Sequence, residues 1–127
     1  MSKNKEIIAT PANPALPFST VVGFESLVFV SGIVGRDPKS GGMAAGDMTA
    51  QTRQALTNIA EQIGKAGITL KNALKVTVFV TDMKRFKEMN TAYLEFFREG
   101  LPARSCVGVT ALPDPEALVE IEVIAHR

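Results

Sequence analysis

The chain has 127 residues, 46% of them hydrophobic and 21% charged, which is enough apolar material for one folded core and too little length for two. Fourteen Lys and Arg against thirteen Asp and Glu leave a formal net charge of +1, so the broad basic field used in nonspecific nucleic-acid binding is missing. We therefore predict a single domain over residues 1–127 and do not expect a polyanion partner.

The N-terminal third is expected to contain one strand between two irregular segments. Residues 1–17 are predicted to form an irregular or extended arm, since Pro11, Pro14 and Pro17 fix φ and remove backbone donors. Residues 26–31 are rich in β-favouring side chains and apolar on both alternating faces, which predicts a strand covered on both sides. Residues 32–46 contain five glycines, which predicts turns and a loop.

The remaining two thirds alternate between helical and strand patterns. Apolar residues recur at helical spacing over residues 48–65, with Asp47 or Thr49 as N-cap and Gly67 as terminator. The three- and four-residue steps over residues 83–100 predict a second amphipathic helix, with Asp82 as its N-cap. Strict alternation predicts a strand over residues 73–81, and two more strands are expected over residues 104–110 and 118–126.

This order of elements predicts an α+β fold. Each helix connects two strands by a crossover long enough for them to run parallel, and the right-handed rule for such crossovers places both helices on one face of the sheet. The other face is then uncovered, although its strands carry apolar residues. Packing against further copies of the chain is the simplest way to cover it, so we predict an oligomer.

Most familiar catalytic signatures are absent from the sequence. It has no phosphate loop, no dinucleotide fingerprint and no Cys-x-x-Cys pair. A metal site usually needs three or four ligands, and the chain has a single histidine, His126. Neither a metal nor another cofactor is expected. The lone cysteine, Cys106, cannot form an internal disulfide, and no apolar run reaches the roughly 18 residues that cross a bilayer. Since the first residues do not resemble a signal peptide, we expect a cytoplasmic protein without membrane contact.

Two strand patterns place reactive side chains together. Alternation puts Arg104 and Cys106 on one face of their strand, and Glu120 and Glu122 on one face of the last strand. Taken alone, these patterns favour ordinary roles: a strand-end charge in solvent, a small buried thiol and a solvated acidic face. A glutamate in a partly dry cleft would instead have a raised pKa and could move protons to or from water.

A series of short motifs resembles the RidA/YjgF/UK114 family in the same order along the chain. The C-terminal motifs are Pro102-Ala103-Arg104-Ser105, Leu112-Pro113, Val119-Glu120-Ile121-Glu122 and Ile124-Ala125. The upstream motifs are Pro17-Phe18-Ser19, Val30-Ser31-Gly32, Gln51-Thr52-Arg53-Gln54-Ala55-Leu56, Asn58, Ala66-Gly67, Lys75-Val76-Thr77-Val78-Phe79, Asp82-Met83, Met89-Asn90 and Tyr93. Each motif is weak alone, but the collinear series covers roughly residues 11–125.

The resemblance implies a chorismate-mutase-like (YjgF-like) mixed sheet with two helices on one face, assembled as a homotrimer with ligand clefts between subunits. It also implies hydrolysis of 2-aminoacrylate and related 2-imino acids to 2-keto acids and ammonia, without a cofactor. In this scheme Arg104 binds the substrate carboxylate and Glu120 positions or deprotonates the attacking water. The substrate would also contact Cys106, Ser31, Gly32, Phe18 and Asn90.

Two departures leave the substrate open. Many family members have tyrosine where this chain has Phe18, and glutamine where it has Ile33. The alternatives are a specialised, aminomuconate-like deaminase, a non-catalytic metabolite-binding or chaperone-like protein, and an endoribonuclease. The near-neutral charge and the lack of a basic aromatic platform argue against the last of these.

Overall fold

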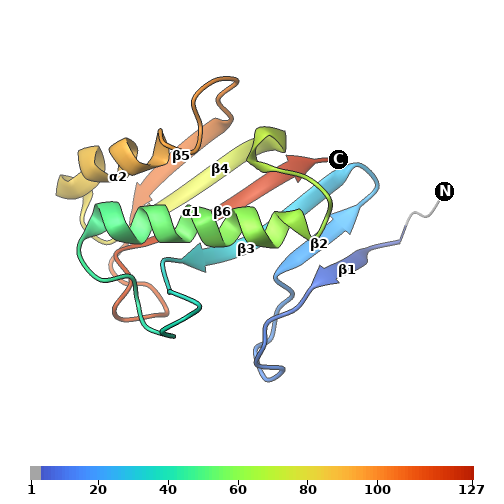
Figure 1. Cartoon of the computed structure of the whole chain (residues 1–127), viewed down its shortest axis with the longest axis horizontal. Coiled ribbons are helices and arrows are strands. Elements are labelled where there is room, and N and C mark those ends of the chain that lie inside the picture. Colours follow the sequence, from blue (N-terminus) through green and yellow to red (C-terminus); the bar gives the residue numbers. More distant parts are fainter. Residues whose placement is uncertain (1–3) are drawn as a thin grey trace.

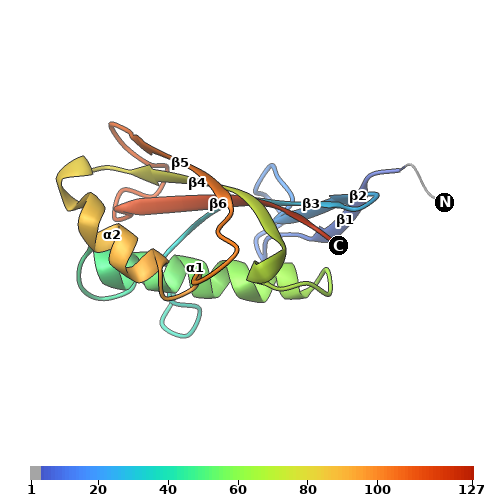
Figure 2. The ribbon, with the colours of Figure 1, turned by 90° about the horizontal axis from the view of Figure 1, so that it is seen from above.

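The sheet has six strands, and both helices pack on one of its faces (Figures 1 and 2). The structure is a computed structural model and describes residues 4–127. The strands are β1 (Glu6–Ala9), β2 (Val21–Phe24), β3 (Leu27–Val34), β4 (Ala73–Val80), β5 (Ala103–Gly108) and β6 (Val119–His126). The helices are α1 (Met48–Gly64) and α2 (Phe86–Tyr93), with short 3-10 turns at η1 (Leu70–Asn72) and η2 (Met83–Arg85).

The strand order across the sheet is β1-β2-β3-β6-β4-β5. The β4 and β5 strands pair in parallel, whereas the other neighbours pair antiparallel, so the sheet is mixed. Seen from above, α1 and α2 both lie below the sheet (Figure 2). The predicted α+β architecture, with two helices on one face of a mixed sheet, is confirmed.

The first helix forms where the periodicity predicts it. Of the two candidate caps, Asp47 is the one used: its Oδ1 accepts hydrogen bonds from the backbone N–H of Thr49 (3.1 Å) and Ala50 (3.3 Å). The buried stripe includes Leu56, Ile59 and Ile63. Beyond the helix, Gly67 adopts a positive φ of 77°, as expected of a terminating glycine.

The second helix is shorter than predicted. Instead of extending over residues 83–100, the segment begins with the 3-10 turn η2, capped by Asp82, and α2 ends at Tyr93. Residues 94–96 continue as turns, and the N–H groups of Phe96 and Phe97 both bond to the Tyr93 carbonyl. These consecutive phenylalanines both pack against the core. The N–H groups of Glu95 and Phe96 bond to carbonyls three residues back rather than four, so the chain leaves α-helical geometry here.

The arm over residues 1–17, predicted to be irregular or extended, contains a paired strand that was not predicted, because Glu6–Ala9 form β1 and pair with β2, another strand that the sequence did not predict. All three prolines of the arm follow β1, so they do not interrupt its pairing. Residues 1–3 of the predicted arm lie outside the described residues. The next glycine-rich segment is also shorter than expected, because β3 continues through Gly32 to Val34.

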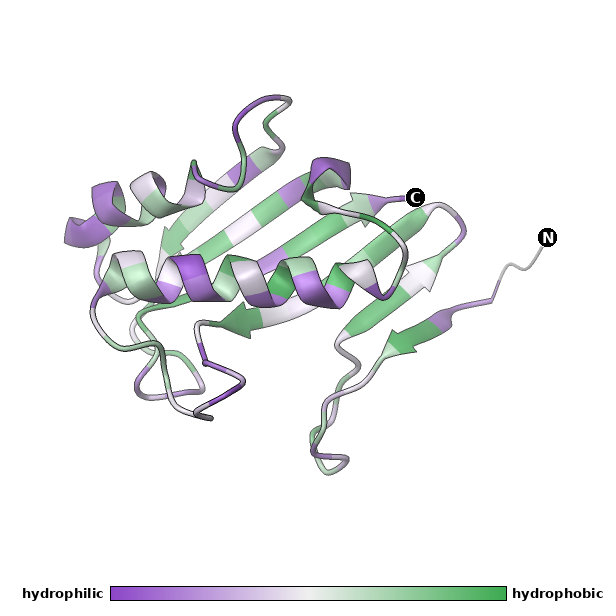
Figure 3. Ribbon diagram, viewed as in Figure 1, coloured by the Kyte–Doolittle hydropathy of each residue, from purple (hydrophilic) through white to green (hydrophobic). Residues whose placement is uncertain are grey.

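The two faces of the sheet differ in their covering. Buried side chains facing the helices form the core, with Val28 and Val30 of β3, the valines of β4 and β6, and Ile121 among its members. Figure 3 shows hydrophobic residues alternating with polar ones along β6, whereas β3 is hydrophobic over most of its length. On the opposite face, Phe24, Leu27, Phe29 and Val107 are 37–40% exposed. The strand expected to be covered on both sides is thus covered on only one within a single chain. No helix in residues 4–127 has the length and apolar character to span a bilayer.

Candidate functional site

Arg104 lies at the edge of the sheet, on the face that carries α2. Its Nη1 donates a hydrogen bond of 2.7 Å to the Asn90 side-chain oxygen. Its guanidinium carbon lies 4.8 Å from the ring centre of Tyr93 and 5.7 Å from that of Phe86. One hydrogen bond and two aromatic faces therefore fix the group while leaving other N–H donors for a ligand. Arg104 borders a hollow of about 280 Å³, which Leu101 also lines.

The α2 sequence explains how this arrangement forms. Phe86, Asn90 and Tyr93 are spaced i, i+4 and i+7, so they share one face of the helix. Tyr93 is 4% exposed, and burial raises the pKa of its hydroxyl, partly offset by the nearby Arg104 charge. The hydroxyl has no hydrogen-bond partner within residues 4–127.

Cys106 lies on the same face of β5 as Arg104, as the alternation predicts. In the parallel pairing with β4, Arg104 is opposite Val76 and Cys106 is opposite Val78, and both valines face the helices. Burial raises the pKa of the Cys106 thiol, and the Arg104 charge offsets this only in part. The thiol is therefore protonated at neutral pH, which does not suit a nucleophile.

Glu120 lies on the uncovered face, in a second hollow of about 590 Å³. Its neighbours across the sheet are Val34 on β3 and Phe79 on β4. Burial raises the pKa of the Glu120 carboxyl, with a smaller contribution from the charge of Glu122. A carboxylate with a raised pKa is suited to accepting a proton near neutral pH.

Gly32 and Phe18 line this second hollow, and Ser31 precedes Gly32 on β3. A Cβ added at Gly32 would lie 2.7 Å from the Glu120 Oε2, so any larger residue there would displace the carboxylate from its position against β3. The Ser31 hydroxyl donates to the carbonyl of Ser19 at 2.6 Å and so ties down the segment that carries Phe18. Phe18, 49% exposed, forms an apolar wall of the hollow. Ser31 thus has a structural partner already, whereas Gly32 and Phe18 border the space itself.

The predicted site residues therefore form two groups. Arg104, Asn90 and Cys106 lie on the helix-covered side of the sheet, whereas Gly32 and Glu120 belong to the opposite side, with the sheet between them. Within one chain the proposed carboxylate-binding group does not meet the proposed base. Ile33 lines a different hollow, next to Asn58 and Gln62.

Sequence reasoning missed several residues around these groups. Phe86 was expected only on the apolar face of the second helix, and Tyr93 on that face and among the family motifs, yet both flank Arg104. Asn90 could have indicated this, because it is a polar residue on the otherwise apolar face of the helix. The contact between Arg36 and Asp114, beside Glu120, joins residues 78 positions apart and leaves no pattern in the local sequence.

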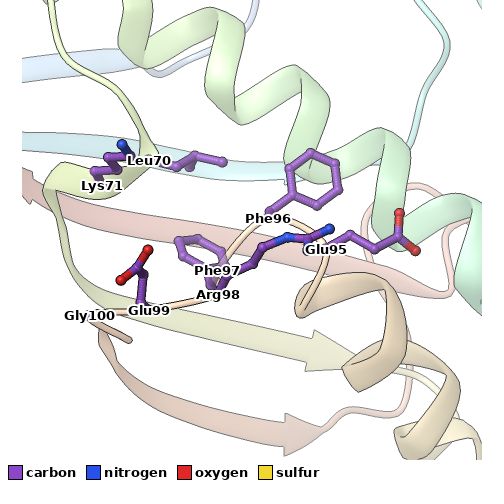
Figure 4. Close-up of a pocket in the computed structure, with 8 residues that line it drawn as sticks. All are labelled: Leu70, Lys71, Glu95, Phe96, Phe97, Arg98, Glu99 and Gly100. Atoms are coloured by element: carbon purple, nitrogen blue, oxygen red, sulfur yellow. The ribbon is translucent and has the colours of Figure 1, made fainter.

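A further hollow, of about 190 Å³, lies on the helix side and contains none of the predicted site residues. It is lined by Leu70, Lys71, Glu95, Phe96, Phe97, Arg98, Glu99 and Gly100 (Figure 4). Its charged side chains balance in sign, and Glu95 is already paired with Arg53. Across residues 4–127, no cluster of three or more His, Cys, Asp or Glu side chains could hold a metal ion. We assign no ligand to this hollow.

Comparison with known proteins gives consistent matches over nearly the whole chain. Residues 8–127 match the model of a family described as Endoribonuclease L-PSP. A RutC family protein of Pyrococcus horikoshii is 41% identical over 125 residues, covering 97% of this chain and 98% of that protein. A Bos taurus protein named 2-iminobutanoate/2-iminopropanoate deaminase is 38% identical over 123 residues, covering 95% and 89%. The crystal structure of the YjgF gene product of E. coli superposes with a TM-score of 0.87 at 37% identity, covering 96% and 98%.

Proposed function

Because this chain belongs to the RidA/YjgF/UK114 family, whose matching model is described as Endoribonuclease L-PSP, we propose that it hydrolyses 2-imino acids to 2-keto acids and ammonia. Relatives named as 2-iminobutanoate/2-iminopropanoate deaminases, such as the Bos taurus protein, support a deaminase-like activity. The observation that carries the proposal is Arg104, whose guanidinium is held by Asn90 and two aromatic rings while donors remain for a carboxylate.

Arg104 would bind the substrate carboxylate through charge-assisted hydrogen bonds. A planar guanidinium can donate two parallel hydrogen bonds to a carboxylate, which a lysine ammonium cannot. The bond to Asn90 uses one donor of Nη1, and stacking on Tyr93 restricts rotation of the group. Substrate binding then orders few additional degrees of freedom, and the reacting C=N bond has a fixed orientation.

Glu120 would supply the proton transfers. Its carboxylate accepts a proton from water as the oxygen attacks the C2 carbon, giving a tetrahedral adduct that carries both oxygen and nitrogen. The protonated Glu120 returns this proton to nitrogen, its carboxylate then carries the hydroxyl proton of the adduct to nitrogen as well, the C–N bond breaks, and ammonia leaves as the keto group forms. An enamine such as 2-aminoacrylate must first take up a proton at C3 to become the imine.

The site would be completed by a second copy of the chain. Arg104 and Glu120 lie on opposite sides of one sheet, so one chain cannot bring both to the same substrate. The uncovered face also exposes Phe24, Leu27 and Phe29 next to the strands around Glu120. Packing this face against the Arg104 edge of a neighbour would bury apolar surface and join the two groups. The family resemblance makes the expected assembly a homotrimer.

The test measures keto-acid release from imines made in situ. A serine or threonine dehydratase supplies 2-aminoacrylate or its four-carbon homologue, and release is followed with the chain and without it. We expect acceleration by the wild type and a loss of at least about thirtyfold in kcat/KM for Arg104→Ala. Arg104→Lys should recover only part of the activity, because lysine keeps the positive charge but cannot donate two parallel hydrogen bonds to the carboxylate.

Arg98→Ala is the matched control, since it removes an exposed arginine that borders neither the Arg104 nor the Glu120 hollow. Its activity should equal that of the wild type. If the wild type did not accelerate release, the proposal would fail for these substrates, and imines of other amino acids would be screened next. Incubation of the same preparations with RNA would test the activity that the family description names.

A further inference from the structure

The side chain of Arg36 joins two loops that are distant in sequence. Its Nη1 donates to the Gly41 carbonyl at 2.6 Å within its own loop, residues 35–46. Its Nη2 pairs with the carboxylate of Asp114 in the loop of residues 111–118. We call this contact the Arg36–Asp114 pair. The hydrogen bond from Arg36 holds the pKa of the Asp114 carboxyl below its ordinary value, so the carboxylate is ionised at neutral pH.

Both loops are also anchored on α1. The Asn58 amide donates to the Arg36 carbonyl at 2.8 Å, which fixes the start of the first loop. Gln51 donates to the carbonyl of Glu116 at 3.1 Å and accepts from the N–H of Leu118 at 2.7 Å, which fixes the end of the second. The Arg36 side chain extends from the anchored start of the first loop to Asp114, two residues before the anchored Glu116, so the Arg36–Asp114 pair joins the two loops directly.

The pair lies in the wall of the hollow that contains Glu120. Arg36, Asp114 and Glu116 line that hollow together with Leu16 and Phe18. The second loop leads directly into β6, where Glu120 is the second residue. If Arg104 of a neighbouring copy holds the substrate carboxylate and Glu120 lies near C2, the substrate side chain extends into this hollow. The two loops then limit the space that it can occupy.

We infer that the Arg36–Asp114 pair is a positioning pair that fixes the loop wall of the Glu120 hollow and thereby sets which substrate side chains the site accepts. The inference rests on the proposed imine hydrolysis. The Asp114 side chain is only 19% exposed, and without Arg36 its carboxylate would keep only the hydrogen bond that it accepts from the Glu116 N–H at 3.1 Å. It would then turn toward water. Pro113 and Pro115 flank it and restrict the backbone, so the loop would shift together with the side chain.

The experiment compares a small and a bulky substrate in Arg36→Gln, Asp114→Asn and the double variant. The dehydratase supplies the three-carbon imine from serine, and an L-amino-acid oxidase supplies the imine of phenylalanine. For each single variant we expect the preference for the small imine, as a ratio of kcat/KM values, to fall by about fivefold, with little further change in the double variant. Arg53→Gln breaks an exposed ion pair with Glu95 outside this hollow and should leave the ratio unchanged.

Hydrogen exchange of the Glu116, Ala117 and Leu118 amides provides a readout that does not depend on catalysis. Exchange should be faster by about fivefold in both single variants and unchanged in Arg53→Gln. Faster exchange with an unchanged ratio would overturn the inference, because the pair would then hold the loop without affecting selectivity. Unchanged exchange together with an unchanged ratio would overturn it as well. Failure of the proposed function is recognised separately, since the wild type alone would then hydrolyse no imine.

Discussion

The substitution Asn90→Asp tests whether Arg104 binds the substrate carboxylate. It converts the neutral oxygen 2.7 Å from the Arg104 Nη1 into a charged one without changing the size of the side chain. The new carboxylate would share the guanidinium with the substrate carboxylate. At a separation of about 5 Å, two unit charges repel by about 1 kcal/mol in water-like surroundings and by about 3 kcal/mol at an effective dielectric constant of about 20.

Activity and stability should therefore change in opposite directions. We expect kcat/KM to fall by about fivefold to about a hundredfold, mainly through a higher KM. The free energy of unfolding should rise at the same time, because Arg104 gains a partly buried ion pair. Asn90→Ala removes the hydrogen bond without adding charge, so it should impair binding less and should also lower stability.

The assay is steady-state imine hydrolysis, with thermal unfolding measured on the same preparations. Asn72→Asp is the matched control: its side-chain oxygen accepts from the Thr69 N–H at 3.3 Å, a role that aspartate can keep, and it lines neither hollow of the proposed site. The reasoning would be refuted if Asn90→Asp were more stable than the wild type yet equally active. Arg104 would then be a structural arginine.

Three further results are expected. Because burial raises the pKa of Glu120, activity should fall as pH decreases through that pKa and the carboxylate becomes protonated. Glu120→Gln should be inactive. It should nevertheless unfold at a higher temperature than the wild type at neutral pH, because the wild type must keep a poorly solvated carboxylate ionised. Cys106→Ser should retain activity within about threefold, since a thiol with a raised pKa is no nucleophile; complete loss in a folded protein would show otherwise. Phe29→Asp should convert the assembly to monomers in sedimentation velocity and abolish hydrolysis, and an active monomer would contradict the two-copy site.

Local sequence patterns predicted those parts of the fold that depend on local physics. The α1 helix has a strong 3.6-residue period and a capping aspartate, so its limits agree with the prediction to within one residue. The strict alternation of β4 and β5 also placed Arg104 and Cys106 on the same face correctly. In contrast, Phe96 and Phe97 continue the helical spacing although the chain has already left the helix, because both are accommodated by tertiary packing.

Contacts across the fold were not predictable in this way. The Arg36–Asp114 pair joins residues 78 positions apart, and neither residue interrupts a local pattern. Asn90 and Tyr93 could be placed on one helix face, but nothing in the sequence indicates that this face meets β5 rather than solvent. The family resemblance supplied a role for Arg104 and Glu120, whereas the structure is needed to see that they lie on different sides of the sheet.

If the proposed site is shared between two copies, the uncovered face has a second role beyond burial of apolar surface. A site formed within one chain would remain active in a monomer. A site divided between the Arg104 edge of one copy and the Glu120 face of another exists only where two copies meet. Assembly and activity should then share one concentration dependence. Dilution below the dissociation constant should reduce the activity per chain, and the activity should return when an Arg104→Ala chain is mixed with a Glu120→Gln chain, because some interfaces in such a mixture contain both intact groups.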